Sequence, residues 1–438
     1  MNLGLVTLGC SKNQVDSEVM LGFFKSKGFN IVNNPEEAEV IVVNTCGFIE
    51  SAKKEAIDTI FEMADYKQYG ICKYLIVTGC LVKRYKNDIL KLMPEVDLCI
   101  GNDEYDKFDT IFSDFFKLNL PCKKLSFGDR LISTKFPMAY VKISDGCDNR
   151  CTYCAIPSIR GNHRSRKMED IVDEVKMLSS QGISEICLIA QDTTKYGVDL
   201  YGKYMLAELI RKISEIEGIK WIKILYMYLY EVTDELIEEI KNNDKVAKYF
   251  DVPIQHIDDD ILKAMNRHDT SKIIYDTIEK IRKNIPNAIL RTTVITGFPG
   301  ETEENFEHLY NAVKSIKFDR LGGFTYSQEE GTKSAEFKNQ IDEKVKKDRL
   351  DKILKAQQEI SLEKMKERIG EKTEVIVYDI SEDEKYFVCR SIKEAPDVDG
   401  NIYIEINEET ANKVVIGEYC NVQIIDNNEY DLFAKLAY

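Results

Sequence analysis

Three cysteines in one loop carry the clearest chemistry in the sequence. Cys147, Cys151 and Cys154 follow a predicted strand with the spacing C-x3-C-x2-C. A structural zinc site usually has four ligands in two C-x2-C-type pairs, and no histidine follows at zinc-ligand spacing. Three thiolates on a 4Fe–4S cluster leave one iron open to a bidentate ligand. The spacing therefore favours an iron–sulfur cluster, and the alternative is a zinc knuckle completed by a distant cysteine.

A second set of cysteines recurs along the N-terminal region. Cys10, Cys46 and Cys80 each follow a predicted strand, at intervals close to the ~30 residues of one βα unit. The carboxyl ends of parallel strands open at one edge of a sheet, so these thiols should converge. A single free cysteine is usually a small buried hydrophobe, but three at equivalent positions favour a second iron–sulfur site. The remaining cysteines are interpreted as core or incidental residues: Cys72, Cys99, Cys122, Cys187, Cys389 and Cys420.

The elements that must position these residues alternate between short β-rich runs and helical segments. In the N-terminal region, runs at 3–8, 40–43 and 74–77 alternate with helices, which predicts a parallel α/β sheet. Six further strands are expected at 140–143, 185–190, 221–227, 249–254, 289–295 and 320–326. About 190 residues are too few for an eight-unit barrel, so a partial six-unit (βα) barrel is expected.

The pattern changes again after Gly370. Short strands separated by turns predict a small antiparallel β-barrel. We therefore expect an α/β protein with three domains: an N-terminal α/β domain at 1–125, the partial barrel at 138–370, and the small β-barrel at 371–438.

Composition narrows the class of protein. The chain has 438 residues, of which 44% are hydrophobic and 31% charged, as in soluble globular proteins. No run of ~18 apolar residues predicts a membrane span, and the N-terminus does not resemble a signal peptide. We therefore expect a cytoplasmic protein with reduced cysteines. The net charge is −15, and residues 371–438 carry −10 of it.

The loop from Cys147 to Cys154, with Tyr153 before its last cysteine, resembles the motif of the radical S-adenosylmethionine (SAM) superfamily. This resemblance implies the partial six-unit barrel and reductive cleavage of SAM to a 5′-deoxyadenosyl radical. It also implies contacts to SAM from the cluster loop and from the turn after the fifth barrel strand. The cofactor-binding residues implied are Tyr153, Gly297, Pro299, Gly300 and Glu301. The turn itself, with two glycines and a proline before Thr-Glu-Glu, predicts a tight bend into a helix N-cap.

Two three-cysteine sets and a small C-terminal barrel together look like the methylthiotransferase family. In that family the second cluster carries or presents sulfur, and the C-terminal barrel, called TRAM, binds the target. One branch modifies a tRNA adenosine, and the other modifies an aspartate of small-subunit ribosomal protein S-twelve. The segments that look like the ribosomal-protein branch are Gly9–Asn13, Val15–Glu18, Asn44–Ile49, Gln191–Gly197, Pro253–His256, Ala395–Gly400 and Glu429–Leu432.

The charge distribution agrees with the ribosomal-protein branch. A barrel that binds tRNA should be basic, because phosphate neutralisation dominates affinity, whereas an acidic barrel suits a basic ribosomal protein. The resemblance implies conversion of an aspartate to 3-methylthioaspartate by C–H abstraction, sulfur insertion and methyl transfer. It implies two 4Fe–4S clusters, SAM, and an electron donor such as flavodoxin or ferredoxin, with no membrane partner and tRNA disfavoured.

Two alternatives stay open. The first is a tRNA adenosine methylthiotransferase. The second is a non-catalytic iron–sulfur electron carrier or scaffold, although carriers normally close every iron with four cysteines. Weaker site candidates follow the cluster loop and the second barrel strand. Arg160, Arg164 and Arg166 could hold a carboxylate or pair with nearby acids, and Asp192 and Lys195 could contact substrate or cofactor.

Overall fold

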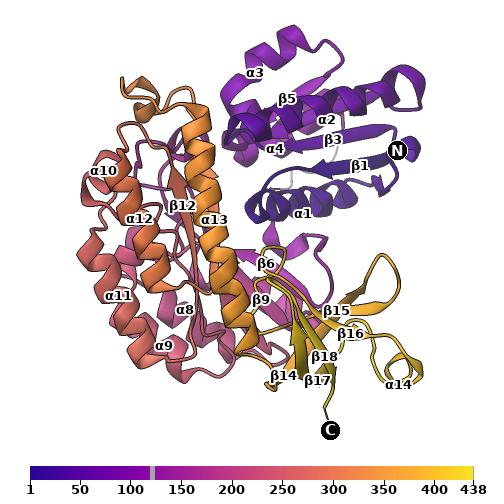
Figure 1. Cartoon of the computed structure of the whole chain (residues 1–438). Coiled ribbons are helices and arrows are strands. Elements are labelled where there is room, and N and C mark those ends of the chain that lie inside the picture. The colour runs from indigo at the N-terminus through magenta and orange to yellow at the C-terminus, as the bar shows by residue number, and fades with distance from the viewer. Residues whose placement is uncertain (119–123, 438) are drawn as a thin grey trace.

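The computed structural model describes residues 1–118 and 124–437. Cys122 lies outside these residues. Along the chain follow a five-stranded sheet, two three-stranded sheets that together form a half-barrel, and a closed five-stranded barrel (Figure 1). No helix in the described ranges is long and apolar enough to span a bilayer.

The N-terminal sheet has the order β2-β1-β3-β4-β5, and all of its strand pairs are parallel. Its strands are β1 (Asn2–Thr7), β2 (Asn30–Ile31), β3 (Val40–Thr45), β4 (Tyr74–Gly79) and β5 (Leu98–Gly101). Its helices are α1 (Ser11–Ser26), α2 (Glu50–Tyr69), α3 (Cys80–Leu92) and α4 (Phe108–Phe116). One face packs against α1 and α4, and the other against α2 and α3. With both faces covered, β3 is buried throughout and reads as a continuous apolar run.

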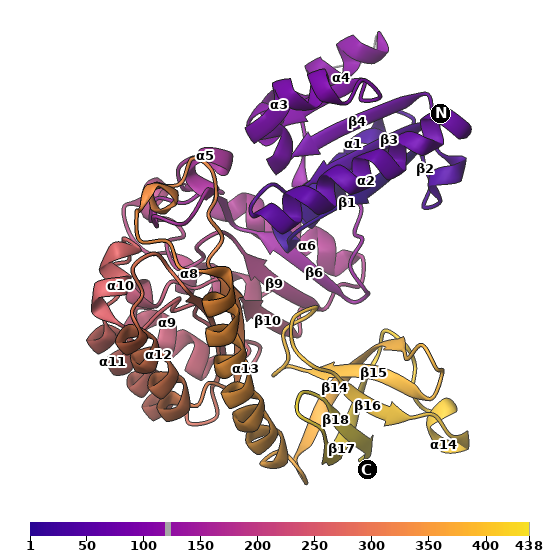
Figure 2. The same cartoon turned by 45° about the horizontal axis from the view of Figure 1, so that its top comes forward.

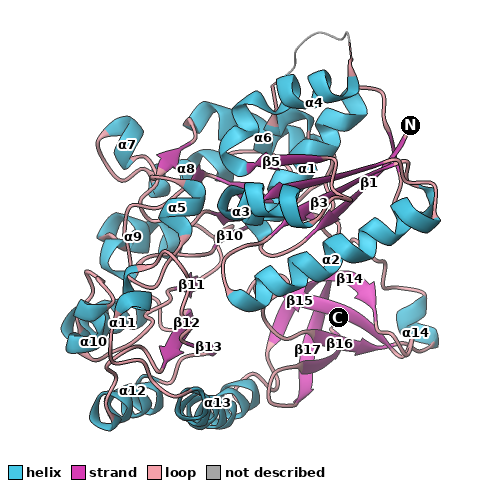
Figure 3. Ribbon diagram, turned by 90° about the horizontal axis from the view of Figure 1, so that it is seen from above, coloured by secondary structure: helices cyan, strands magenta, loops and turns pink. Residues whose placement is uncertain are grey.

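The central region confirms the partial six-unit barrel. The parallel sheets β10-β9-β6 and β11-β12-β13 are joined by a parallel bridge between Ile222 and Val246. Their strands are β6 (Met138–Lys142), β9 (Glu185–Ile189), β10 (Trp221–Ile224), β11 (Tyr249–Asp251), β12 (Ile289–Thr296) and β13 (Arg320–Thr325). The outer helices are α6 (Met168–Ser180), α8 (Leu206–Ser214), α9 (Asp234–Asn242), α11 (Ser271–Asn284) and α12 (Glu303–Ile316). Seen from above, helices line the outside of the strands (Figure 3).

Shorter elements complete this region at the loops that follow its strands. They are β7 (Ser144–Asp145), α5 (Ile156–Arg160), β8 (Arg164–Ser165), α7 (Val198–Tyr201) and α10 (Asp259–Ala264). The long helix α13 (Glu343–Lys366) packs on β13 and α12 and leads to the C-terminal barrel (Figure 2).

The C-terminal barrel closes in the order β14-β15-β16-β18-β17. Its elements are β14 (Lys372–Ile380), β15 (Tyr386–Ser391), β16 (Ile402–Glu405), α14 (Glu408–Ala411), β17 (Tyr419–Asn427) and β18 (Leu432–Leu436). The antiparallel pattern expected from the sequence holds except between β16 and β18, which pair in parallel. The reason is geometric, because an odd number of strands cannot alternate in direction all the way round a closed ring.

The loop between β15 and β16 inserts into the half-barrel. Ala395 packs in the same buried cluster as Tyr140, Cys187 and Tyr249. The Tyr140 hydroxyl donates to Asp397 Oδ2 at 2.8 Å, and the Tyr249 hydroxyl donates to Asp399 Oδ2 at 2.8 Å. These partly buried hydrogen bonds attach the two barrels to each other, and they engage part of the acidic charge of the C-terminal region within the protein.

Candidate functional site

The N-terminal cysteines converge at the carboxyl edge of the five-stranded sheet, as their spacing predicts. Cys10 is the N-cap of α1, Cys46 follows β3, and Cys80 begins α3. Gly9 has a φ of +91°, and a Cβ there would lie 2.7 Å from the Cβ of Cys46. Burial raises the pKa of Cys80 to about 12, and the charges of Cys10 and Cys46 add to the shift. The three thiols are therefore close enough for the charges of Cys10 and Cys46 to affect the pKa of Cys80.

Asn13 connects the loops that carry these thiols. Its Nδ2 donates to the carbonyls of Leu8 and Thr45, both at 3.0 Å. Its Oδ1 accepts from Arg160 Nη2 at 2.6 Å and from Cys80 Sγ at 3.7 Å. One side chain therefore contacts the surroundings of all three cysteines.

Cys10 differs from its two neighbours in its electrostatics. Desolvation by the surrounding protein raises its pKa, but the charges of Lys12 and Arg160 and backbone N–H groups of Asn13 and Lys12 outweigh it. The pKa of Cys10 is therefore lowered, whereas burial raises the pKa of Cys46. A helix N-terminus and nearby cations are the surroundings that favour a thiolate.

The central cysteines lie on the loop between β7 and α5. A Cβ on Gly146, whose φ is +78°, would lie 2.1 Å from the carbonyl oxygen of Asn162, so glycine is required where the loop turns. Thr152 anchors the loop: its N–H donates to the carbonyl of Met265 at 2.9 Å, and its carbonyl accepts from Ser334 N–H at 2.9 Å.

The thiols on this loop are also mutually close. Burial raises the pKa of Cys147 to about 12, with further contributions from the charges of Asp192 and Cys151. The pKa of Cys154 is raised by burial, then by the charges of Cys151 and Cys147. Each set thus supplies three free thiols in one environment.

Both donor sets consist of three cysteine thiols. In the part of the chain that the structure describes, no three His, Cys, Asp or Glu side chains are grouped to hold one metal ion. A structural zinc site gathers its ligands within about 2.3 Å of one ion. A 4Fe–4S cluster takes each thiolate on a different iron, so its ligands stand further apart. Each set supplies three thiols, which suits a 4Fe–4S cluster with one open iron, whereas a structural zinc site usually takes four ligands.

The turn after β12 lies beside the central loop. Tyr153 packs against the buried cluster that contains Phe298. Glu301 Oε2 accepts from the N–H groups of Gly297 at 2.7 Å and Phe298 at 3.3 Å, and its Oε1 accepts from Arg349 Nη1 at 2.9 Å. Both carboxylate oxygens of Glu301 are thus used to shape the turn.

The backbone of this turn has the predicted form. Gly297 and Gly300 have φ values of +71° and +88°, and Pro299 between them is buried. Thr302 is the N-cap of α12, and its hydroxyl accepts from Asn305 N–H. The predicted tight bend into a helix N-cap is confirmed.

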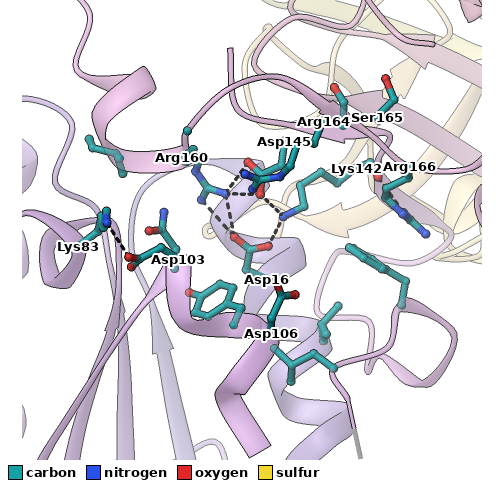
Figure 4. Close-up of a pocket in the computed structure, with 18 of the residues that line it drawn as sticks. Asp16, Lys83, Asp103, Asp106, Lys142, Asp145, Arg160, Arg164, Ser165 and Arg166 are labelled. Carbon is teal, nitrogen blue, oxygen red and sulfur yellow. Dashed lines mark hydrogen bonds and ion pairs between the residues drawn. The ribbon is translucent and has the colours of Figure 1, made fainter. Parts of the chain in front are cut away.

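A buried ionic network joins the two cysteine regions (Figure 4). Arg160 Nη1 lies 3.1 Å from Asp16 Oδ2 and 3.2 Å from Asp145 Oδ1, and Lys142 pairs with both carboxylates. Of the two roles open to Arg160, pairing with nearby acids is the one the structure shows. The network borders a cavity of about 740 Å³ between the N-terminal sheet and the half-barrel, which Arg164 and Arg166 also line.

Sequence reasoning included Asn13 and Asp16 only within family-like segments and assigned them no role, because Arg160 and Lys142, with which they pair, are remote in sequence. It missed Lys142 altogether. It also missed Glu231. Burial raises the pKa of Glu231 to about 8, and the charge of Asp192 adds to the shift. Asp192 in turn accepts from Asn149 Nδ2 at 2.8 Å, which places this carboxylate pair beside the central cysteine loop.

Three family models match the chain. They describe the radical SAM superfamily (residues 141–313), the uncharacterized protein family UPF0004 (residues 2–101) and the TRAM domain (residues 369–436). The chain is 47% identical over 449 residues to "Ribosomal protein uS12 methylthiotransferase RimO" of Acetivibrio thermocellus, covering 99% of this chain and 98% of that protein. It is 48% identical over 437 residues to the protein of the same name from Alkaliphilus oremlandii, covering 100% and 99%.

Solved structures share the fold at low identity. The radical SAM methyltransferase TsrM of Kitasatospora setae, with tryptophan and a SAM analogue bound, superposes with a TM-score of 0.54 at 12% identity. The match covers 74% of this chain and 72% of that one. It supports the common architecture alone.

Proposed function

The chain belongs to the family of radical SAM methylthiotransferases named for ribosomal protein uS12, and from this premise we propose that it converts an aspartate of that protein to 3-methylthioaspartate. The reaction comprises C–H abstraction, sulfur insertion and methyl transfer. The observation that carries the proposal is the pair of three-cysteine sets, each in its own domain and linked through Asn13 and Arg160.

We assign the roles by region. Residues 138–370 form the radical SAM domain, in which Cys147, Cys151 and Cys154 hold the reducing 4Fe–4S cluster. Residues 1–125 form the domain in which Cys10, Cys46 and Cys80 hold the second cluster. When bound, the first cluster and SAM supply a carbon radical able to take hydrogen from an unactivated C–H bond, which side-chain acids and bases cannot do.

The chain's own residues orient this chemistry. Tyr153, Gly297, Pro299 and Gly300 line the place proposed for SAM, and Glu301 holds the turn in shape through its bonds to backbone N–H groups and Arg349. The hydrogen bond between Asn13 and Arg160 fixes the positions of the two cysteine regions relative to each other.

Residues 371–438 form the proposed target-docking domain. Several of their acids are engaged internally, for example Glu374 with Lys220 and Asp379 with Lys135. Exposed acids remain on β16, β17 and α14 and on the turns between the elements: Glu382, Glu384, Glu405, Glu408, Glu418 and Asp426. This surface suits a basic ribosomal protein and disfavours tRNA. We place the reaction in the cytoplasm, with a flavodoxin- or ferredoxin-type electron donor.

The test is mass spectrometry of ribosomal proteins and tRNA from cells with and without this protein. The expected result is a methylthio group on one uS12 aspartate that disappears with the gene, while tRNA modification is unchanged. Loss of a tRNA methylthio group with unmodified uS12 in both strains would overturn the choice of substrate.

A further inference from the structure

Lys12 is a buried cation without a polar partner. It is 7% exposed, and its Nζ lies 3.1 Å from the centroid of the Tyr226 ring. Across residues 1–118 and 124–437, no hydrogen bond or ion pair engages this ammonium. Burying an ammonium without a hydrogen-bonding or charged partner is costly, and a ring face offsets only part of that cost. A bound anion would offset the remaining cost of burying the Lys12 ammonium.

Two buried arginines near the cysteine sets already have partners. Arg160 is held by Asn13, Asp16 and Asp145. Arg267 donates to Asp269 and to the carbonyl of Pro253. Of these three buried cations in the described part of the chain, Lys12 is the one with no hydrogen bond or ion pair from the protein.

The Tyr226 ring is held beneath Lys12 by a strained backbone. Tyr226 has a φ of +61°, which a bulky side chain seldom adopts. Its N–H donates to Asp251 Oδ2 at 2.8 Å, and its carbonyl accepts from Thr193 N–H at 3.0 Å. Strain of this kind persists where the surroundings enforce it, and it concentrates at functional sites.

Lys12 also lies in the first turn of the 16-residue helix α1, which has no acidic residue there. The positive end of the helix dipole adds to the lysine charge. Lys12 is close enough to Cys10 to influence its thiol electrostatically. An anion bound here would lie between the sulfur-presenting cysteines and the carboxyl end of β10.

We propose that Lys12 binds the side-chain carboxylate of the substrate aspartate, an inference that rests on the proposed function. The reacting β-carbon is bonded directly to that carboxylate. A cation beside Cys10 therefore sets the distance of this carbon from the sulfur. It also gives a physical reason for accepting aspartate and rejecting asparagine, which has the same shape without the charge.

The test compares Lys12→Met, which keeps an unbranched side chain of similar length and removes the charge, with Lys12→Arg, which keeps the charge. Lys73→Met is the matched control, because Lys73 pairs with Glu39 at the surface of the same domain. Holoenzyme of each variant is titrated anaerobically with the uS12 target peptide and with the same peptide carrying Asn in place of the target Asp. Iron content and substrate-free SAM cleavage are measured in parallel.

Wild type and Lys73→Met should prefer the Asp peptide by roughly ten- to hundredfold. Lys12→Met should bind both peptides alike, and Lys12→Arg should keep part of the preference. An intact Asp preference in Lys12→Met, or an equal loss for both peptides, would overturn the inference. If Lys12→Met does not fold, Lys12→Gln is judged by the same ratio. Product formation by wild type tests the proposed function separately.

Discussion

Asn13 and Arg160 are 147 residues apart in the chain, and yet Arg160 Nη2 donates to Asn13 Oδ1 at 2.6 Å. Asn13 ties together the loops of Cys10, Cys46 and Cys80. Arg160 ends the helix that follows Cys154. This hydrogen bond therefore links the N-terminal cysteine set to the central cysteine set, across the boundary between the five-stranded sheet and the half-barrel.

Arg160 should be critical for this arrangement. Arg160→Met leaves Asp16 and Asp145 with Lys142 alone, and breaking such a buried network costs about 3–5 kcal/mol. Arg160→Lys should recover only part of this stability, because an ammonium lacks the planar fork that reaches several acceptors. Urea unfolding of both variants measures the loss. Equal stability of wild type and Arg160→Met would contradict the role of this network.

Cluster content should separate by cysteine set. Anaerobically reconstituted protein should hold two 4Fe–4S clusters, about eight iron per chain. Replacing Cys147, Cys151 and Cys154 by Ala should halve the iron, and substituting the buried Cys72 should leave it unchanged. Iron analysis and absorption spectra measure the cluster content of each variant. Zinc at either set, or loss of a single iron, would refute the cluster assignment.

Radical generation and sulfur insertion should be separable functions. A triple Ala variant at Cys10, Cys46 and Cys80 leaves the loop around Cys154 intact, so reduced protein should still cleave SAM. It should form no methylthio product, because no second cluster presents sulfur. Chromatography of 5′-deoxyadenosine alongside mass spectrometry of the target distinguishes the two steps. Full product formation by this variant would make the N-terminal set merely structural.

Protonation of Glu394 in acid should destabilise the packing of the C-terminal barrel against the rest of the protein. Burial by itself raises the pKa of this carboxyl, but Arg368, Arg320 and the Ser391 hydroxyl lower it from 4.5 to about 2. A lowered pKa stabilises the fold fully above pH 4.5, and this contribution is lost as pH falls towards 2. The lowered pKa of Glu394 corresponds to about 3 kcal/mol of the free energy of unfolding. Urea unfolding should therefore show a larger deficit for Glu394→Gln at pH 6 than at pH 3, whereas a pH-independent deficit would contradict this linkage.

The exposed acids of the C-terminal barrel should steer the basic target. Glu405→Lys with Glu408→Lys should slow association with uS12 several-fold at low salt, and the difference should shrink as salt rises. Asp58→Lys with Glu62→Lys is the matched control, since it reverses two exposed acids on α2. Stopped-flow association across a salt series measures the effect. An equal slowing by both pairs would point to net charge rather than to this surface.

The sequence by itself determined the architecture and the repetition within it. Continuous apolar runs such as Val40–Val43 predict buried parallel strands, and the structure has the expected half-barrel of six parallel strands. Local signals also predicted the turn before Thr302, because glycine, proline and N-cap preferences act within a few residues. The three N-terminal cysteines could be expected to converge, because a βα repeat returns each strand end to the same edge.

Tertiary structure alone decided how these parts meet. The contacts of Arg160 with Asn13, of Lys12 with Tyr226, and of Tyr249 with Asp399 join residues more than 140 positions apart. No spacing rule predicts them, since each depends on how parts of the chain that belong to different sheets pack together. The parallel pair β16–β18 likewise follows from ring closure and not from any strand's own residues. Side chains from different domains pair only after the packing of those domains has removed both partners from water at the same site.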